Sequence, residues 1–142
     1  MRATLDASVI LKWYISTPNE QDAGQARALL DGIQNNTISL VQPPHALAEV
    51  AAVLARELPN QASDYFLELN RIFAESGISH GTAVYQRAIE LARQHNHHLF
   101  DTLYHAAALE ESATFITADR RYYDKAKLAG HIMMLEDLTG IV

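Results

Sequence analysis

Short apolar runs alternate along the chain with longer segments in which apolar residues recur every three or four positions. The short runs predict five β-strands, at residues 2–6, 37–41, 77–80, 114–117 and 131–135. The segments between them are long enough to form helices. Because strands that alternate with helices usually build a parallel sheet covered by helices, the pattern predicts an α/β domain with a parallel, roughly five-stranded sheet.

Capping residues and prolines mark the expected ends of the helices. Thr17-Pro18-Asn19-Glu20 forms a capping box with proline at the first helical position, so it predicts a helix from there to about Gln34. A second helix is expected to open at Pro43 and Pro44 and to end at Pro59-Asn60, and a third to be capped by Ser63 and to end near Gly77. The last three predicted helices run through Val84 to Ala92, from about His98 to Ser112, and from Asp119 to Gly130.

The composition indicates one domain with a sizeable core. The chain has 142 residues, of which 49% are hydrophobic, so we expect a single domain over residues 1–142. It has no cysteine, which excludes disulfides and thiolate metal sites and leaves oxygen and imidazole as metal ligands. The net charge of -6 argues against a protein that coats nucleic acid through a general positive field, but it is compatible with local basic patches.

We expect the protein to be soluble and cytoplasmic, with no membrane partner. The N-terminus lacks the basic segment, apolar core and cleavage site of a secretion signal. No run approaches the roughly 18 apolar residues that a membrane-spanning helix needs.

One acidic residue lies in an otherwise mainly apolar stretch near the N-terminus. Asp6 follows the first predicted strand directly, where the chain turns into a helix. In open parallel sheets, ligands bind at this carboxyl edge, beside the point where the strand order reverses. Asp119 occupies the equivalent place after the fourth predicted strand. The sequence therefore predicts two carboxylates at the same edge of the sheet.

Two further acids, Glu49 and Asp101, lie in helical segments so rich in alanine and leucine that both helices are expected to be buried. Taken singly, each of the four acids has an ordinary explanation, as a helix cap, a first-turn acid or a solvated side chain. A shared ligand explains all four together. Because two carboxylates about 4 Å apart repel by roughly 4 kcal/mol at an effective dielectric constant of 20, that ligand should be a cation. All-oxygen ligation favours Mg²⁺ or Mn²⁺.

Four segments that contain these acids resemble the four acidic motifs of PIN-domain ribonucleases. They are TLDASVILKWY, HALAEVAAVL, FDTLYHAAALE and FITADRRYY, in this order, and the resemblance covers essentially the whole chain. Within that family, the short chain is most similar to the toxins of VapBC-type toxin–antitoxin pairs. The resemblance implies a PIN-like three-layer α/β/α fold and an endoribonuclease that depends on Mg²⁺ or Mn²⁺ and hydrolyses phosphodiester bonds in RNA.

The resemblance also implies a role for each acid. Asp6 and Asp101 would bind the metal, and Asp119 would complete its coordination directly or through water. Glu49 would orient or deprotonate the attacking water. Two hydroxyl groups would support these acids by hydrogen bonds, those of Ser8 and Thr117.

The same resemblance implies partners for the chain. RNA is the expected substrate, and a cognate antitoxin would lay an apolar helix into a groove between the predicted helices at 43–58 and 62–76. A homodimer is also expected. Five basic side chains are candidates either for gripping RNA phosphates or for a solvated surface, those of Lys12, Arg120, Arg121, Lys125 and Lys127. Two aromatic side chains are candidates for base stacking or for packing, those of Tyr122 and Tyr123.

Three other interpretations of the sequence differ in what they require of its residues. His98, Asp101 and His105 share one helix face, with further histidines nearby, and would suit a hydrolase with zinc, nickel or iron. A PIN-like domain used only for dimerisation or protein contact should have lost one or more of the acids, yet all four are present. A haloacid-dehalogenase phosphotransferase is disfavoured because Ser8 stands where that pattern needs a second aspartate.

Overall fold

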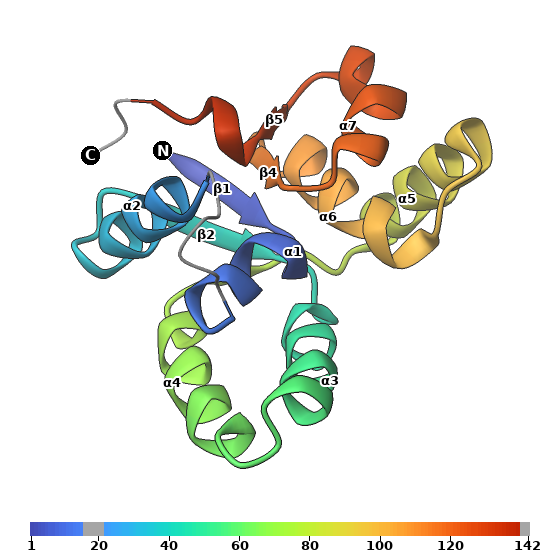
Figure 1. Cartoon of the computed structure of the whole chain (residues 1–142). Coiled ribbons are helices and arrows are strands. Elements are labelled where there is room, and N and C mark those ends of the chain that lie inside the picture. The colour runs from blue at the N-terminus through green and yellow to red at the C-terminus, as the bar shows by residue number, and fades with distance from the viewer. Residues whose placement is uncertain (16–21, 140–142) are drawn as a thin grey trace.

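A parallel β-sheet forms the centre of the molecule. The computed structural model describes residues 1–15 and 22–139. The five strands are β1 (Arg2–Leu5), β2 (Ser39–Gln42), β3 (Gly77–Ile78), β4 (Thr114–Thr117) and β5 (Ile132–Met134), and they lie in the order β3-β2-β1-β4-β5 (Figure 1). Each strand pairs in parallel with its neighbours. The predicted sheet is therefore confirmed.

Seven α-helices among the described residues connect and cover the strands. They are α1 (Ala7–Ile10), α2 (Ala23–Gln34), α3 (Ala46–Glu57), α4 (Ala62–Ala74), α5 (Thr82–His95), α6 (Leu99–Glu110) and α7 (Arg120–Ala126). Because connections between parallel strands are right-handed, α1 to α4 lie on one face of the sheet and α5 to α7 on the other. This is the predicted three-layer arrangement, and α3 and α4 extend from it as a hairpin (Figure 1). None of the helices in the described ranges is long and apolar enough to cross a membrane.

Several helix boundaries differ from the predictions for local reasons. Gln61 rather than Ser63 precedes α4, so Ser63 lies inside the first turn. Gly77 opens β3 instead of ending α4, and α3 begins only after a turn at the two prolines. Gly130, with a φ of +80°, ends the short 3-10 helix (Lys127–Ala129) that follows α7, as predicted. The capping box predicted at 17–20 lies outside the described residues.

The most deeply buried helix is α6, which carries one of the four predicted acids. Seven consecutive residues, from Thr102 to Ala108, are buried, and the helix packs against β1, β2 and β4. The ring of Tyr104 stacks on that of Phe115 in β4, with centroids 6.0 Å apart. The prediction of a buried helix is confirmed for α6. It is wrong for α3, which buries only the stripe of Ala46, Val50 and Leu54, while three of its other alanines are exposed.

The strand order changes direction between β1 and β4. After β1 the chain adds β2 and β3 on one side of β1, and it then returns to add β4 and β5 on the other side. The connections that follow β1 and β4 therefore lead away from each other in the sheet. The register pairs Leu5, the last residue of β1, with Ile116 in β4. Asp6 and Asp119 follow the two strand ends, so both acids lie at the edge where α/β sheets bind ligands.

Candidate functional site

Asp6 accepts hydrogen bonds from both sides of the point where the strand order reverses. It caps α1, and the backbone N–H of Val9 donates to its Oδ1 atom at 3.3 Å. Ser8 donates to Oδ1 and Thr117, at the end of β4, donates to Oδ2, each at 2.5 Å. The backbone N–H of Asp119 donates in turn to the Thr117 hydroxyl at 3.0 Å. The supporting hydrogen bonds expected of Ser8 and Thr117 are therefore present, and they join the ends of β1 and β4.

The environment of Asp6 favours its neutral form. Burial raises the pKa of Asp6 from 3.8 to about 6, although hydrogen bonds from Ser8, Thr117 and Val9 act in the opposite direction. The negative charge of Asp101 raises the pKa further, because the two carboxylates share this edge of the sheet. The metal-free site therefore carries unfavourable negative charge, which a bound cation relieves.

Replacing Asp6 with Asn is expected to stabilise the metal-free protein at pH 8 and to have little effect at pH 4. A carboxyl group whose pKa is raised on folding stabilises the fold while it is protonated, so this stabilisation is complete below 3.8 and is lost as the pH rises through about 6. A neutral amide avoids the loss, which amounts to about 1–3 kcal/mol. Thermal unfolding of both proteins in EDTA, between pH 4 and 8, measures the difference. A difference that stays constant over this range would contradict the raised pKa.

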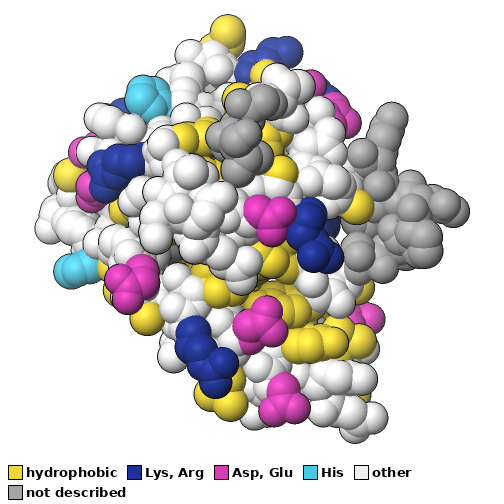
Figure 2. Space-filling model, turned by 90° about the vertical axis from the view of Figure 1, so that its left-hand side faces the viewer, with side chains coloured by type: hydrophobic (Ala, Val, Ile, Leu, Met, Phe, Trp, Pro, Cys, Tyr) yellow, Lys and Arg dark blue, Asp and Glu magenta, His cyan; other side chains and the backbone are white. Residues whose placement is uncertain are grey.

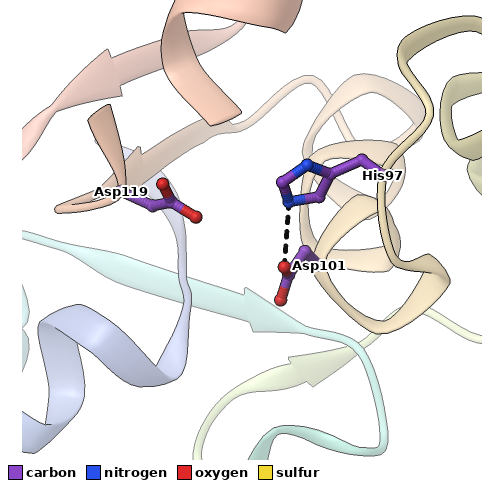
Figure 3. A group of neighbouring side chains, drawn as sticks. All are labelled: His97, Asp101 and Asp119. Carbon is purple, nitrogen blue, oxygen red and sulfur yellow. Dashed lines mark hydrogen bonds and ion pairs between the residues drawn. The ribbon is translucent and has the colours of Figure 1, made fainter. Parts of the chain in front are cut away.

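Asp101, Asp119 and His97 converge at the same edge of the sheet. Asp101 lies in the first turn of α6 and His97 just before it, whereas Asp119 caps α7 and accepts a hydrogen bond from the backbone N–H of Tyr122 at 3.1 Å. One ligand atom from each of the three side chains lies within 4.8 Å of the others. Figure 3 shows the Asp119 carboxylate directed towards the other two residues, which are joined by a 3.0 Å contact between His97 Nε2 and Asp101 Oδ2. The fold thus brings Asp101 and Asp119 together.

Glu49, on α3, is linked to the other acids through Tyr104. The Tyr104 hydroxyl donates to Glu49 Oε1 at 2.6 Å, and His45 Nε2 lies 3.4 Å from the same oxygen. Partial burial raises the pKa of Glu49, but the hydrogen bonds from His45 and Tyr104 outweigh this effect and hold the pKa below its usual range. Burial and the hydrogen bond to Glu49 raise the pKa of Tyr104. The charges of Asp6 and Asp101 raise it further, so Tyr104 lies within the electrostatic field of all three carboxylates.

The donor set of this site fits a small divalent cation. Asp6, Asp101 and Asp119 offer carboxylate oxygens, which are the ligands that Mg²⁺ and Mn²⁺ prefer. Ligand atoms from Asp101 and Asp119 are close enough to bind one ion at about 2.1 Å after small side-chain movements. The Asp101 side chain is 41% exposed, which leaves the position accessible to substrate.

The metal site that the sequence allowed around His98, Asp101 and His105 is not formed. His105 is buried, and its two ring nitrogens contact the Tyr122 hydroxyl and the backbone oxygen of Gly130, each at 2.8 Å. His105 therefore has no nitrogen available for a metal shared with Asp101. Tyr122 is itself buried, so it packs in the core rather than stacking on bases.

Sequence reasoning missed Tyr104, and it counted His97 only among the histidines near a possible zinc, nickel or iron site. Tyr104 follows Asp101 by three positions on a buried helix, and this spacing was a usable signal. No local pattern predicts that His97 contacts Asp101, because the position of His97 depends on Asn96, which ends α5 in a left-handed conformation with a φ of 49°.

Two basic side chains that were candidates for RNA contacts are paired with acids. Lys12 Nζ lies 3.3 Å from Asp22, and Arg120 pairs with Glu136. Among the residues drawn in colour in Figure 2, basic side chains on that face stand singly between acidic ones and form no continuous patch. Next to Asp101, in contrast, lies a hollow of about 200 Å³ lined by Asn96, His97, His98, Arg121 and Lys125.

Comparison with known proteins gives one family and several similar structures. The family described as PIN domain matches residues 3–128. FitAcB from Neisseria gonorrhoeae is similar with a TM-score of 0.65 and 21% identity, covering 97% of this chain and 100% of that chain. FitAB bound to the IR36 DNA fragment has a TM-score of 0.63 and 21% identity, with 99% of each chain covered. VapC20 from Mycobacterium tuberculosis, a sarcin–ricin loop cleaving toxin, has a TM-score of 0.62 and 16% identity, covering 92% of this chain and 95% of that chain.

No curated protein sequence matches the chain. At these identities the similar structures show the fold alone, and they confirm the PIN-like α/β/α arrangement. The family match spans most of the chain and includes all four acids, at positions 6, 49, 101 and 119. The chain therefore belongs to the PIN domain family.

Proposed function

We propose that the protein is a metal-dependent endoribonuclease and the toxin of a type II toxin–antitoxin pair. The observation that carries this proposal is the convergence of Asp101 and Asp119 next to Asp6 on the carboxyl edge of a PIN-domain sheet. The name of the structurally similar VapC20, a toxin that cleaves the sarcin–ricin loop, supports RNA as the substrate.

In this proposal, Asp101 and Asp119 hold Mg²⁺ or Mn²⁺ at the part of the site that is open to solvent. When bound, such a cation neutralises charge on the phosphodiester and lowers the pKa of a water molecule. Oδ1 of Asp6 accepts hydrogen bonds from both Ser8 and the backbone N–H of Val9, whereas Oδ2 accepts only from Thr117 and keeps a lone pair, so Asp6 stays a proposed ligand beside Asp101. The hydroxyl groups of Ser8 and Thr117 keep its carboxylate in one orientation.

Glu49 is better placed to orient the attacking water than to deprotonate it. Its pKa lies below the usual range, so at neutral pH it is ionised and a weak base. The hydrogen bond from Tyr104 fixes the direction of the carboxylate. An ionised and fixed carboxylate accepts a hydrogen bond from water and directs the lone pair of that water towards phosphorus.

The hollow beside Asp101 suits a phosphate that flanks the cleaved bond. Arg121 and His98 are exposed at its rim. Since the whole chain is acidic, such a local concentration of donors is the electrostatic feature that favours RNA at this edge of the protein. We therefore propose that RNA crosses this edge rather than the face shown in Figure 2.

The α3–α4 hairpin offers the surface that we propose for the antitoxin. A cavity of about 260 Å³ at its base is lined by apolar side chains that include Leu47, Phe73 and Ile78. Ile78 is 62% exposed and Leu67 of α4 is 52% exposed. Figure 2 shows hydrophobic side chains gathered on the lower part of the molecule, where this hairpin lies. An apolar helix bound there would bury them. We propose a homodimer on the resemblance to the toxins alone.

Incubation with a mixed RNA pool tests the proposed activity. The protein is expected to cleave RNA at defined positions when Mg²⁺ or Mn²⁺ is present, and the mapped ends then identify the preferred sequence or fold. The control is an Asp101→Asn protein purified in the same way, which detects a contaminating ribonuclease. If the ion binds at Asp101 but no RNA is cut, the chain is a PIN-like binding module instead.

A further inference from the structure

His97 is held between a lysine and the Asp101 carboxylate. Its side chain is 7% exposed and packs on the ring of Tyr122, with centroids 4.7 Å apart. The Lys125 ammonium lies 3.3 Å from His97 Nδ1 and 3.3 Å from the backbone oxygen of Asn96. On the other side of the ring, Nε2 lies 3.0 Å from Asp101 Oδ2. The imidazole therefore has a fixed position, and each of its nitrogens has a partner.

These contacts determine which ring nitrogen carries the proton. An ammonium group only donates hydrogen bonds, so Nδ1 accepts one from Lys125 and carries no proton. The proton of the neutral ring is then on Nε2, which donates to Asp101.

We propose that His97 and Lys125 position the Asp101 carboxylate for cation binding. His97 donates a hydrogen bond to Oδ2, and Lys125 selects the tautomer that makes this donation possible. The bond restricts the rotation of a carboxylate that is 41% exposed, so its other oxygen keeps one direction and loses less conformational freedom when a cation binds. This inference rests on the proposed function, because it takes Asp101 as a cation ligand.

The same contacts argue against His97 as a metal ligand, although its nitrogen is within 4.8 Å of ligand oxygens of Asp101 and Asp119. A protonated Nε2 has no lone pair to offer a cation. Histidines that bind metals almost always donate their second ring N–H to a carboxylate, a carbonyl or water, whereas the second nitrogen of His97 contacts an ammonium donor. His97 is therefore a positioning residue.

Mn²⁺ binding to the metal-free protein, followed by the electron paramagnetic resonance signal of free Mn²⁺, tests this role without any RNA. His97→Leu removes the donor and is expected to weaken Mn²⁺ binding about 10- to 100-fold. His97→Gln is expected to restore most of the affinity, because its amide donates from nearly the same place as Nε2. His80→Leu removes an exposed histidine on another loop and is expected to bind Mn²⁺ like the wild type.

The ¹⁵N chemical shifts of the His97 ring in the metal-free protein test the tautomer directly. The resonances are assigned by their loss in His97→Gln. At a pH where the ring is neutral, we expect a protonated Nε2 and an unprotonated Nδ1 in the wild type. Lys125→Met removes the ammonium donor and is expected to shift the ring towards a mixture of the two tautomers.

The outcomes separate this inference from the proposed function. If the wild type has no Mn²⁺ site that Asp101→Asn removes, the proposed function fails and the inference fails with it. If that site is present and His97→Leu binds Mn²⁺ as tightly as the wild type, only the inference is overturned. A protonated Nδ1 in the wild type, or a Gln variant as weak as the Leu variant, also overturns it.

Discussion

Replacing Asp101 with Asn is expected to lower the rate of RNA cleavage by at least about a hundred-fold and to leave the protein folded. The carboxylate lies where α6, His97 and Asp119 meet. A cation held there contributes several kcal/mol to the transition state, and each 1.36 kcal/mol corresponds to a factor of ten in rate. The amide keeps the shape of the side chain but lacks its charge. Because Asp101 is 41% exposed, the change leaves no large buried polar group without a partner.

Single-turnover cleavage of an RNA selected from the mixed pool measures this loss. Asp64→Asn is the matched control, since Asp64 also lies in the first turn of a helix, α4, and is exposed. Mn²⁺ should raise the melting temperature of the wild type and of the control by mass action, and should raise that of Asp101→Asn much less. A folded Asp101→Asn protein that cleaves RNA at the wild-type rate would remove Asp101 from the proposed site.

The RNA fragments are expected to carry a 5′-phosphate and a 3′-hydroxyl. With water as the nucleophile, the 2′-hydroxyl takes no part in the bond change. EDTA should therefore abolish cleavage, whereas a single 2′-deoxy substitution at the cleaved nucleotide should slow it far less. A pair of histidines acting as acid and base would instead drive the 2′-hydroxyl onto phosphorus and leave a 2′,3′-cyclic phosphate. The structure disfavours this route, because His105 is buried and both of its ring nitrogens are engaged.

Direct ligation of the fragments, without prior end repair, identifies the two kinds of end. A pancreatic-type ribonuclease digest of the same RNA provides the cyclic-phosphate control. Cyclic ends, or cleavage that persists in EDTA and in Asp6→Asn, would contradict the carboxylate mechanism and direct attention to the histidines before α6.

The fold was predictable because its signals are local. Each strand is a short apolar run, and the alternation of strands with helices determines that neighbouring strands are parallel. Asp6 and Asp119 were placed correctly at strand ends for the same reason, since the residue after a strand of a parallel sheet lies at its carboxyl edge. The assigned roles of the four acids stay predictions.

The remaining features of the site depend on contacts between distant segments. Tyr104 reaches Glu49 from another helix, a pairing across 55 positions that no local pattern encodes. His97 meets Asp101 only because Asn96 turns the chain through a left-handed conformation and Lys125 approaches from α7. The high alanine content of α3 and α6 predicted that both helices are buried. Alanine is common on buried and on exposed helix surfaces, so the prediction held for α6 and failed for α3.

The position of β4 has a consequence for the time at which the protein becomes active. β4 pairs with β1 in the interior of the sheet, although more than a hundred residues separate them in the chain. During synthesis β1 is made more than a hundred residues before Thr117 and Asp119. An activity that needs both Asp6 and Asp119 would therefore begin only after β4 has been made and has paired with β1.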